Sequence, residues 1–319
     1  MKSYRGWMIL VVAALVLSVG CKNKKGKTGS TTGTTGSTAG STAAQNEKTP
    51  EPASGIKLSY KELAPGTTVE VSTNSAMDGK VSTRFGDKEN TSKLVNKTSR
   101  KLKFTMLPPE DGKVKPAKIE VLDSFNVAVN PKTGKEEKTE NPTKGKTYTA
   151  FADAKGDVHV QDADGKDANE QEAKLVTSQY KSATSDDAYK KWIADQTFAM
   201  NKPVDLPQEA LNNMVNTSME NQKVDIDTAT MKLISVDDED GTKVATFETN
   251  MKFSAGSEKS PMGISAELAG KVALEVETGR TRSMELSGPI KITATSEKFT
   301  INGSGEMHVD KTATYQGKS

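Results

Sequence analysis

The clearest pattern in the chain is a strict alternation of apolar and polar positions in its C-terminal third. From Met262 to Val276 every second residue is apolar or glycine, and most of the residues between them are polar. A period of two is typical of an antiparallel strand with one buried and one wet face. The same period recurs before and after this run, so residues 224–311 predict five antiparallel strands in a meander.

Two features of this meander indicate local distortion of the strands. The alternation slips by one position at Leu233 and Ile234, which predicts a β-bulge. A straight strand of 15 residues from Met262 to Val276 would be about 50 Å long, so it is expected to coil. The glycines that would ease the bend are Gly263, Gly270, Gly303 and Gly305.

The N-terminal half shows the same alternation in a weaker form. Val69 and Val71 begin it, and Asp78-Gly79 is typical of a hairpin turn. Lys155-Gly156 predicts another turn. The candidate strands cover residues 80–87, 92–107, 119–129, 148–150 and 158–160.

Asp123 interrupts one of these strands because it lies in phase with the apolar face. A bulge beside Leu122 would explain its position. The alternative is a buried carboxylate with a function.

The middle of the chain predicts helices. Glu170 to Ser182 has helical periodicity, and Ser185 can cap a second helix that carries Trp192 and Ile193 on one face. A third helix is expected from Pro207 to Ser218. Strands and helices do not alternate, which argues against a parallel sheet. The predicted fold is mainly β (α+β): one large curved antiparallel sheet or half-barrel of about eleven strands, with two or three helices at about 170–218.

The N-terminus has the layout of a secretory signal. Lys2 and Arg5 precede an apolar run from Met8 to Val19, and the small residue Gly20 follows. The run is too short to span a bilayer comfortably as a helix. Residues 1–20 are therefore predicted to be a signal peptide.

Cys21 follows at once and is the only cysteine, so no intramolecular disulfide can form. Leu17 to Cys21 resembles the lipobox of bacterial lipoproteins, although Ser18 stands where that family usually has Leu. The resemblance implies cleavage before Cys21, acylation of that residue with chains such as palmitate, and a stable membrane anchor. The alternatives are an ordinary signal cleaved nearby, or an uncleaved anchor with a chance cysteine. Lys22, in place of an aspartate, favours the outer over the inner membrane.

Residues 21–54 comprise the cysteine expected to be lipidated and a Gly/Ser/Thr-rich segment that follows it. Such a segment cannot bury a core, so it is expected to be a disordered linker with a reach of about 30 Å. Residues 55–319 would then be a single β-rich domain. Without residues 1–20 the chain has 42 basic and 42 acidic residues, and its basic residues are nearly all lysine. No nucleic-acid partner is expected.

The sequence offers no catalytic constellation. It contains two histidines, His159 and His308, each set between two apolar strand residues and so expected on an exposed face. No Gly-x-Ser-x-Gly elbow, zinc-ligand spacing or phosphate loop is present. The chain is therefore not expected to be an enzyme or to need a cofactor.

Three carboxylates, Asp162, Asp164 and Asp167, surround Gly165 and are the best candidates for a metal site. Clustered carboxylates at a glycine turn suit a hard cation such as calcium. The segment lacks the distant glutamate of a full calcium loop, so an ordinary Asp-Gly turn is the alternative.

The expected architecture resembles the lipoprotein-carrier proteins of the bacterial envelope and related lipid-carrying lipoproteins, in which a half-barrel wraps around helices and encloses an apolar cavity. Gly270 to Arg280 is also similar to a strand and turn of uncharacterised exported lipoproteins. No sequence motif carries the first resemblance, so it assigns no ligand-binding residue. It implies an envelope lipoprotein, at the outer membrane or in the periplasm, that binds a lipid or other apolar ligand. The alternative is a structural or protein-interaction lipoprotein without a small ligand.

Methionines at or near predicted buried positions suit an adaptable pocket as well as ordinary core filling. They are Met200, Met214, Met219, Met231, Met251, Met262, Met284 and Met307.

Overall fold

The computed structural model describes residues 55–130, 133–184, 188–207, 224–256, 262–296 and 299–317. The signal segment, Cys21 and the linker lie outside these ranges. The helix predicted from Pro207 to Ser218 also lies outside these ranges, except for Pro207.

The fold is dominated by one antiparallel sheet of 12 strands, in the order β7-β6-β4-β3-β2-β14-β13-β12-β11-β10-β9, with β5 paired to β4. The expectation of a mainly β, antiparallel sheet is confirmed, and the path is open, with β7 and β9 at its two edges. A separate pair joins β1 and β8. The strands are β1 (Ile56–Lys57), β2 (Thr68–Phe85), β3 (Lys88–Met106), β4 (Val114–Val129), β5 (Glu136–Glu140), β6 (Thr147–Ala152), β7 (Val158–Gln161), β8 (Thr197–Phe198), β9 (Pro203–Asp205), β10 (Val224–Glu239), β11 (Thr242–Gly256), β12 (Met262–Glu275), β13 (Thr281–Thr295) and β14 (Thr300–Gln316).

The chain builds this sheet from the centre outwards and then from the far edge back to the centre. Strands β2 to β7 lead from the middle of the sheet to one edge, while β10 to β14 form a five-strand meander that returns from the other edge. The meander predicted over residues 224–311 is confirmed. Strand β14 closes it by pairing with β2, from Thr68 to Arg84.

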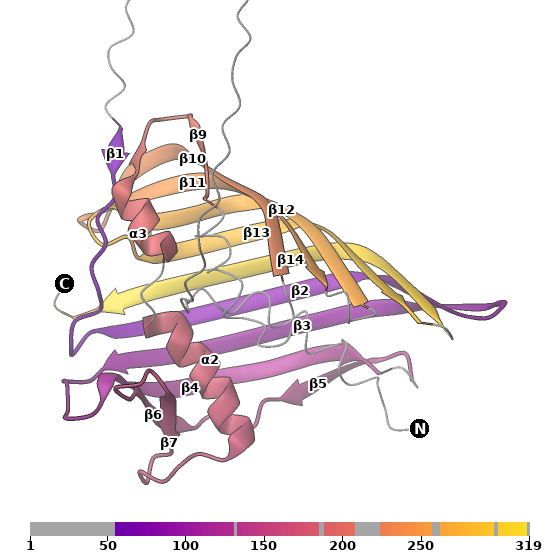
Figure 1. Ribbon diagram of the computed structural model, residues 1–319, viewed down its shortest axis with the longest axis horizontal. Helices are drawn as coiled ribbons and strands as arrows, with labels where there is room; N and C mark the ends of the chain where they lie inside the picture. The colour runs from indigo at the N-terminus through magenta and orange to yellow at the C-terminus, as the bar shows by residue number, and fades with distance from the viewer. Residues whose placement is uncertain are drawn as a thin grey trace, which may run out of the picture.

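In the described part of the connection between the edges there are two helices. They are α2 (Glu170–Thr184) and α3 (Ala188–Asp195), at the positions predicted for the first two helices. Figure 1 shows both on the same side of a twisted, curved sheet, α2 across β4 and β6 and α3 near β10 and β11. We call this side the inner face and the opposite side the outer face.

The buried residues of the inner face form two main clusters. One contains Ile193 of α3 with Met231, Phe247 and Leu274 of the C-terminal meander. The other contains Val176 and Tyr180 of α2 with inward residues of β3, β4 and β6. Each helix thus covers one half of the sheet, because its apolar stripe needs an apolar partner surface.

Both predicted bulges are present. The pairing of β10 with β11 shifts between Leu233 and Ser235, and the pairing of β3 with β4 skips Leu122 beside Asp123. The bulge accounts for the position of Asp123 in phase with the apolar residues of the sequence. The Asp123 carboxylate forms an ion pair with Lys144 at 3.3 Å.

The hairpin predicted at Asp78-Gly79 is wrong. Strand β2 runs straight through both residues, and the chain turns only at Gly86, where φ is +55°. Gly79 lies directly opposite Gly305 of β14, and a Cβ atom on either would collide with backbone of the facing strand. The glycine therefore serves close strand approach, a role that a local turn signal cannot distinguish from a hairpin.

The sequence also missed four short strands: β1, β5, β8 and β9. Strand β5 is Glu-Glu-Lys-Thr-Glu with every residue exposed, so it has no alternation to detect. It is held by pairing with Phe125–Val129 of β4. Pairing of this kind depends on the neighbouring strand and leaves no local signal.

The start of α2 is fixed to the sheet through Glu172. The Asn169 side chain accepts the Glu172 backbone N–H at 3.0 Å and so caps the helix. The Glu172 carboxylate accepts hydrogen bonds from Lys146 Nζ at 2.7 Å and Tyr148 Oη at 2.6 Å. These contacts, that of Lys146 first, lower the pKa of Glu172 from 4.5 to about 2.

We predict that Glu172→Gln lowers the free energy of unfolding at neutral pH by about 2 kcal/mol, because charge-assisted hydrogen bonds are lost. A lowered pKa stabilises the fold above the unfolded value of 4.5, and this stabilisation disappears as pH falls towards 2. The difference between parent and variant should therefore shrink below pH 4.5. Urea titrations at several pH values measure it. Glu170→Gln, in the same helical turn but exposed, is the control and should change little. A difference that stayed constant to pH 2 would contradict the assignment.

A second prediction concerns Gly270 of β12, whose Cβ would meet the Glu285 carbonyl oxygen of β13. Gly270→Ala should destabilise the sheet by about 1–3 kcal/mol, because backbone must move to admit the methyl group. Gly303→Ala is the matched control, since its Cβ would lie 3.1 and 3.3 Å from side-chain atoms of Val81 and Ile292 and 3.6 Å from the Lys80 carbonyl oxygen, an ordinary contact distance. Thermal unfolding should separate the two variants. Equal losses would show that close strand approach at Gly270 is not limiting.

Candidate functional site

A cavity of about 260 Å³ lies on the inner face of the sheet. Its floor is made by inward residues of seven adjacent strands, from β3 through β2, β14, β13, β12 and β11 to β10. The segment Tyr60–Leu63 and the last turn of α2 complete the lining. The cavity thus lies where the two halves of the sheet meet.

Most of the lining is apolar. Towards β3 it comprises Val69, Val71, Leu102, Phe104 and Met106, which belong to or pack against the α2 cluster. Towards β10 it comprises Ala229, Met231, Met251, Met284 and Leu286, which belong to or pack against the α3 cluster. The two main clusters therefore face each other across the cavity.

The methionines divide into several groups. Met231, Met251 and Met284 line the cavity, and Met307 is a buried core residue. Met200 is 43% exposed, so its expected burial is wrong. Its place in the turn before β9 gives it no strand to pack under. Met214 and Met219 lie outside the described residues.

The charged part of the lining is strongly biased. Among the described lining residues one is acidic, Glu62, and five are basic: Lys61, Arg100, Lys115, Arg280 and Lys311. Glu62 is itself engaged, because its carboxylate accepts a hydrogen bond from Lys115 Nζ at 3.1 Å. The cavity therefore combines apolar walls with an excess of positive charge.

Arg100 is the most unusual of these groups. It points inward from β3, in phase with Leu102 and Phe104, and pairs in the ladder with Thr73 of β2. No described residue forms a hydrogen bond or ion pair with its guanidinium, and its Nε is buried without a partner. Burial lowers the pKa of Arg100 from its usual value.

Other polar atoms of the lining also lack partners in the described part of the chain. They are Gln179 Oε1 on α2, Thr249 Oγ1 on β11 and Arg280 Nε in the turn after β12. Arg280 otherwise donates from Nη2 to the Glu62 carbonyl oxygen at 3.3 Å and lies 5.3 Å over the Tyr315 ring. Unsatisfied buried polar atoms are uncommon in folded proteins, and their gathering at one cavity points to a polar ligand group or water there.

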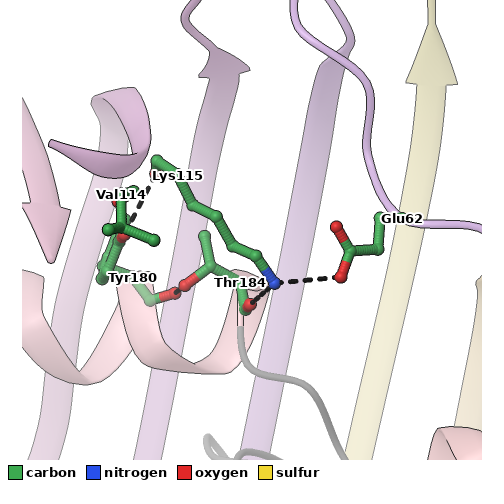
Figure 2. A network of polar contacts seen from close by, with 5 residues as sticks. All are labelled: Glu62, Val114, Lys115, Tyr180 and Thr184. Atoms are coloured by element: carbon green, nitrogen blue, oxygen red, sulfur yellow. Dashed lines mark hydrogen bonds and ion pairs between the residues drawn. The ribbon is translucent and has the colours of Figure 1, made fainter. Parts of the chain in front are cut away.

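One end of the cavity is held by the network in Figure 2, in which Lys115 links α2 to the segment before β2. Lys115 has a φ of +48° in a bulge of β4, and Tyr180 Oη hydrogen-bonds the carbonyl oxygens of Val114 and Lys115 at 2.9 and 3.0 Å. From this bulge Lys115 Nζ donates to the Thr184 carbonyl oxygen at 3.3 Å as well as to Glu62. A cation at the C-terminal end of α2 is favourable to its dipole.

The three aspartates proposed as a cation site form a turn. Asp162 Oδ1 accepts the backbone N–H groups of Asp164 and Lys166 at 2.9 and 3.0 Å, and Gly165 has a φ of +78°. Asp164 and Asp167 are exposed. Within the described ranges, the three carboxylates do not bring their oxygens together as a group of potential metal ligands.

His159 is exposed as expected, stacks on Phe151 and lies 3.4 Å from Asp153. His308 points to the outer face and lies 3.1 Å from Asp310. With Glu285, these two residues bring three potential metal-ligand atoms within 4.8 Å of one another, a grouping that sequence spacing did not suggest. It is created by the β13–β14 register, and a group of exposed polar residues is common without a metal.

Sequence reasoning expected an apolar cavity only through the resemblance to lipid-carrying lipoproteins, and it missed Arg100. A signal was available: Arg100 is in phase with the apolar residues Leu102, Phe104 and Met106, and so belongs to the inner face. Arginine is also scarce in this chain, as the printed sequence shows. Considering the basic residues only by their number and type overlooked the phase of this one.

No helix in the part of the chain that the structure describes is long and apolar enough to cross a membrane. No family model matches the chain, and no curated protein does.

Solved structures similar to this chain include three distant ones. One, titled "Lipid-protein interactions in lipovitellin", has 10% identity and a TM-score of 0.35 over 81% of this chain. The chain spans about a quarter of that protein's length, 26%. Two further examples are a COG4313 outer membrane channel from Pseudomonas putida F1 (8% identity, 81% of this chain and 98% of that one, TM-score 0.22) and a DUF1329 family protein from Desulfovibrio piger (11% identity, 77% and 87%, TM-score 0.13). Likenesses this weak carry no argument about function.

Proposed function

We propose that this chain is a non-catalytic lipoprotein of the bacterial cell envelope whose folded part binds a lipid or another apolar ligand in the cavity of its inner face. The observation that carries the proposal is the cavity itself, about 260 Å³ between two apolar clusters that face each other without merging. Small-molecule sites are typically concave and mostly apolar, with a few polar groups that orient the ligand.

The size of the cavity supports a ligand. Protein interiors are packed as densely as organic crystals and contain few voids larger than a water molecule. The cavity is open to solvent on one side, so water can reach its apolar walls. A ligand that covers these walls with apolar atoms would gain about 25 cal/mol for each Å² of apolar surface removed from water.

The nature of the lining supports adaptable binding. Met231 of β10, Met251 of β11 and Met284 of β13 all line the cavity. Unbranched, polarisable methionine side chains adjust to ligands of different shape. A membrane anchor at Cys21 and a flexible linker over residues 22–54 would keep this site within about 30 Å of a bilayer, with the outer membrane favoured.

To test ligand binding, we would purify the full chain carrying Cys21→Ala and analyse it by native mass spectrometry and by titration with the neutral apolar dye N-phenyl-1-naphthylamine. We expect a discrete co-purifying lipid mass and saturable dye binding. Met251→Trp should weaken dye binding at least about tenfold by filling the cavity, at unchanged fold by circular dichroism. Asn250→Trp, on the outer face of the same strand, is the matched control. A clean apo mass without dye binding would overturn the proposal in favour of a structural or protein-interaction role.

The anchor is tested separately by cell fractionation. The parent chain should sediment with membranes and be released by detergent, whereas Cys21→Ala should move to the soluble fraction because the acylated residue is lost. Ser18→Ala, within the lipobox-like segment but not at the acylated residue, is the control and should remain with membranes. Continued membrane association of Cys21→Ala would show that acylation of this cysteine is not the anchor.

A further inference from the structure

We propose that the ligand of the inner-face cavity is a single-chain anionic amphiphile whose carboxylate or phosphate head binds Arg100 while its apolar tail lies towards β10. The inference rests on the proposed binding function and names the ligand class of the same site. It starts from the charge and position of Arg100 and from the length and composition of the lining.

The first step is the unpaired cation. Arg100 lies on the inner face of β3, and no described side chain or backbone group pairs with its guanidinium. Removing a cation from water is costly unless it is paired, so such groups are normally paired or hydrogen-bonded. A guanidinium offers five donors in a planar fork that matches carboxylate and phosphate oxygens. An anionic head group would therefore complete this site.

The second step is the surroundings of Arg100. The strand register places Thr73 beside Arg100 and Lys311 beside Thr73, in one row across β3, β2 and β14. At about 4.8 Å per strand, the backbones of Arg100 and Lys311 are roughly 10 Å apart, so both side chains can reach one anion between them. All three residues line the cavity.

The third step is the overall charge of the lining. Its five basic residues face a single carboxylate, that of Glu62, which already accepts from Lys115. An anion in this site would therefore be attracted by most of the charged groups around it. A cationic ligand would meet repulsion.

The fourth step is the tail. From β3 to β10 the floor crosses six inter-strand spacings, about 29 Å along the sheet. A bilayer core about 30 Å thick contains two layers of acyl chains, so one chain spans roughly 15 Å. The apolar half of the floor beyond Lys311, through Met284, Met251 and Met231, can accommodate one such chain. A volume of about 260 Å³ lies just below the usual range of about 300–1,000 Å³ for ligand sites, which favours one chain over a diacyl lipid.

The test compares ligands that share a tail and differ in the head. The delipidated full chain carrying Cys21→Ala is titrated with oleate, oleyl alcohol, oleoyl lysophosphatidate and inorganic phosphate, by displacement of N-phenyl-1-naphthylamine and by calorimetry. We expect oleate or lysophosphatidate to bind at least about tenfold more tightly than oleyl alcohol, and phosphate alone not to bind. The tighter of the two anions identifies the head group, and either result supports the proposal.

Variants locate the charge. Arg100→Met should weaken binding of the anionic ligand at least about tenfold while leaving oleyl alcohol within about twofold, and Arg100→Lys should lie between. Lys101→Met, one residue along on the outer face, is the matched control and should change neither. Arg100→Met should also raise the melting temperature of the ligand-free protein, because it removes an unpaired, half-buried cation. If that variant fails to fold, the comparison of oleate with oleyl alcohol on the parent chain still decides.

Three outcomes would overturn the inference. Equal affinities for oleate and oleyl alcohol would remove the role of charge. Equal weakening of both by Arg100→Met would make Arg100 a packing residue. Binding of inorganic phosphate as tight as that of the lipids would indicate a simple anion site. Absence of binding by all lipids and the dye is a different result, since it would overturn the proposed function itself.

Discussion

The arrangement of this protein depends on the pairing of β14 with β2. This ladder joins the N-terminal half of the sheet to the C-terminal meander, and it runs from Thr68–Gln316 to Arg84–Thr300. Because both strands occupy the centre, the chain between them must leave at one edge and return from the other. The connection carries α2 and α3, and each helix packs on the half of the sheet nearest to it. The middle of the inner face, over β2 and β14, is left for the cavity.

The same constraint explains the glycines. Gly79 and Gly305 face each other at the central seam, and neither position has room for a Cβ atom. Gly270 and Gly288 make similar close approaches to the backbones of β13 and β12. Strands of this length must coil, and the close approaches lie where side chains would resist that. The curvature that encloses a cavity is thus encoded at a few positions near the centre.

Local patterns predicted the parts of this fold that local chemistry determines. The meander, both bulges and the first two helices were found because one face of each element is buried and the period of the sequence reports it. The seam between β2 and β14 was not found, because strands more than 200 residues apart leave no joint signal in one sequence. Asp78-Gly79 was wrongly interpreted as a hairpin turn for the same reason. The glycine at position 79 is explained by Gly305, which faces it in the sheet but is remote in the sequence. Arg100 was overlooked because its meaning depends on Thr73 and Lys311, which only the register brings beside it.

The distribution of charge separates the two faces by role. On the outer face, exposed lysines and glutamates pair across strands, as in Lys101 with Glu70 and Lys252 with Glu267. Exposed pairs of this kind contribute little stability and mainly keep the face wet. On the inner face charge is rare, and at the centre it is basic and incompletely paired, which is costly to maintain. If the proposed ligand binds there, its anionic head pairs with Arg100 and lowers the free-energy cost of the unpaired cation. Arg100 would therefore destabilise the empty site and make the filled site specific for anions. A tether that holds the domain near a bilayer would then supply anionic amphiphiles at high local concentration, and modest affinity would suffice.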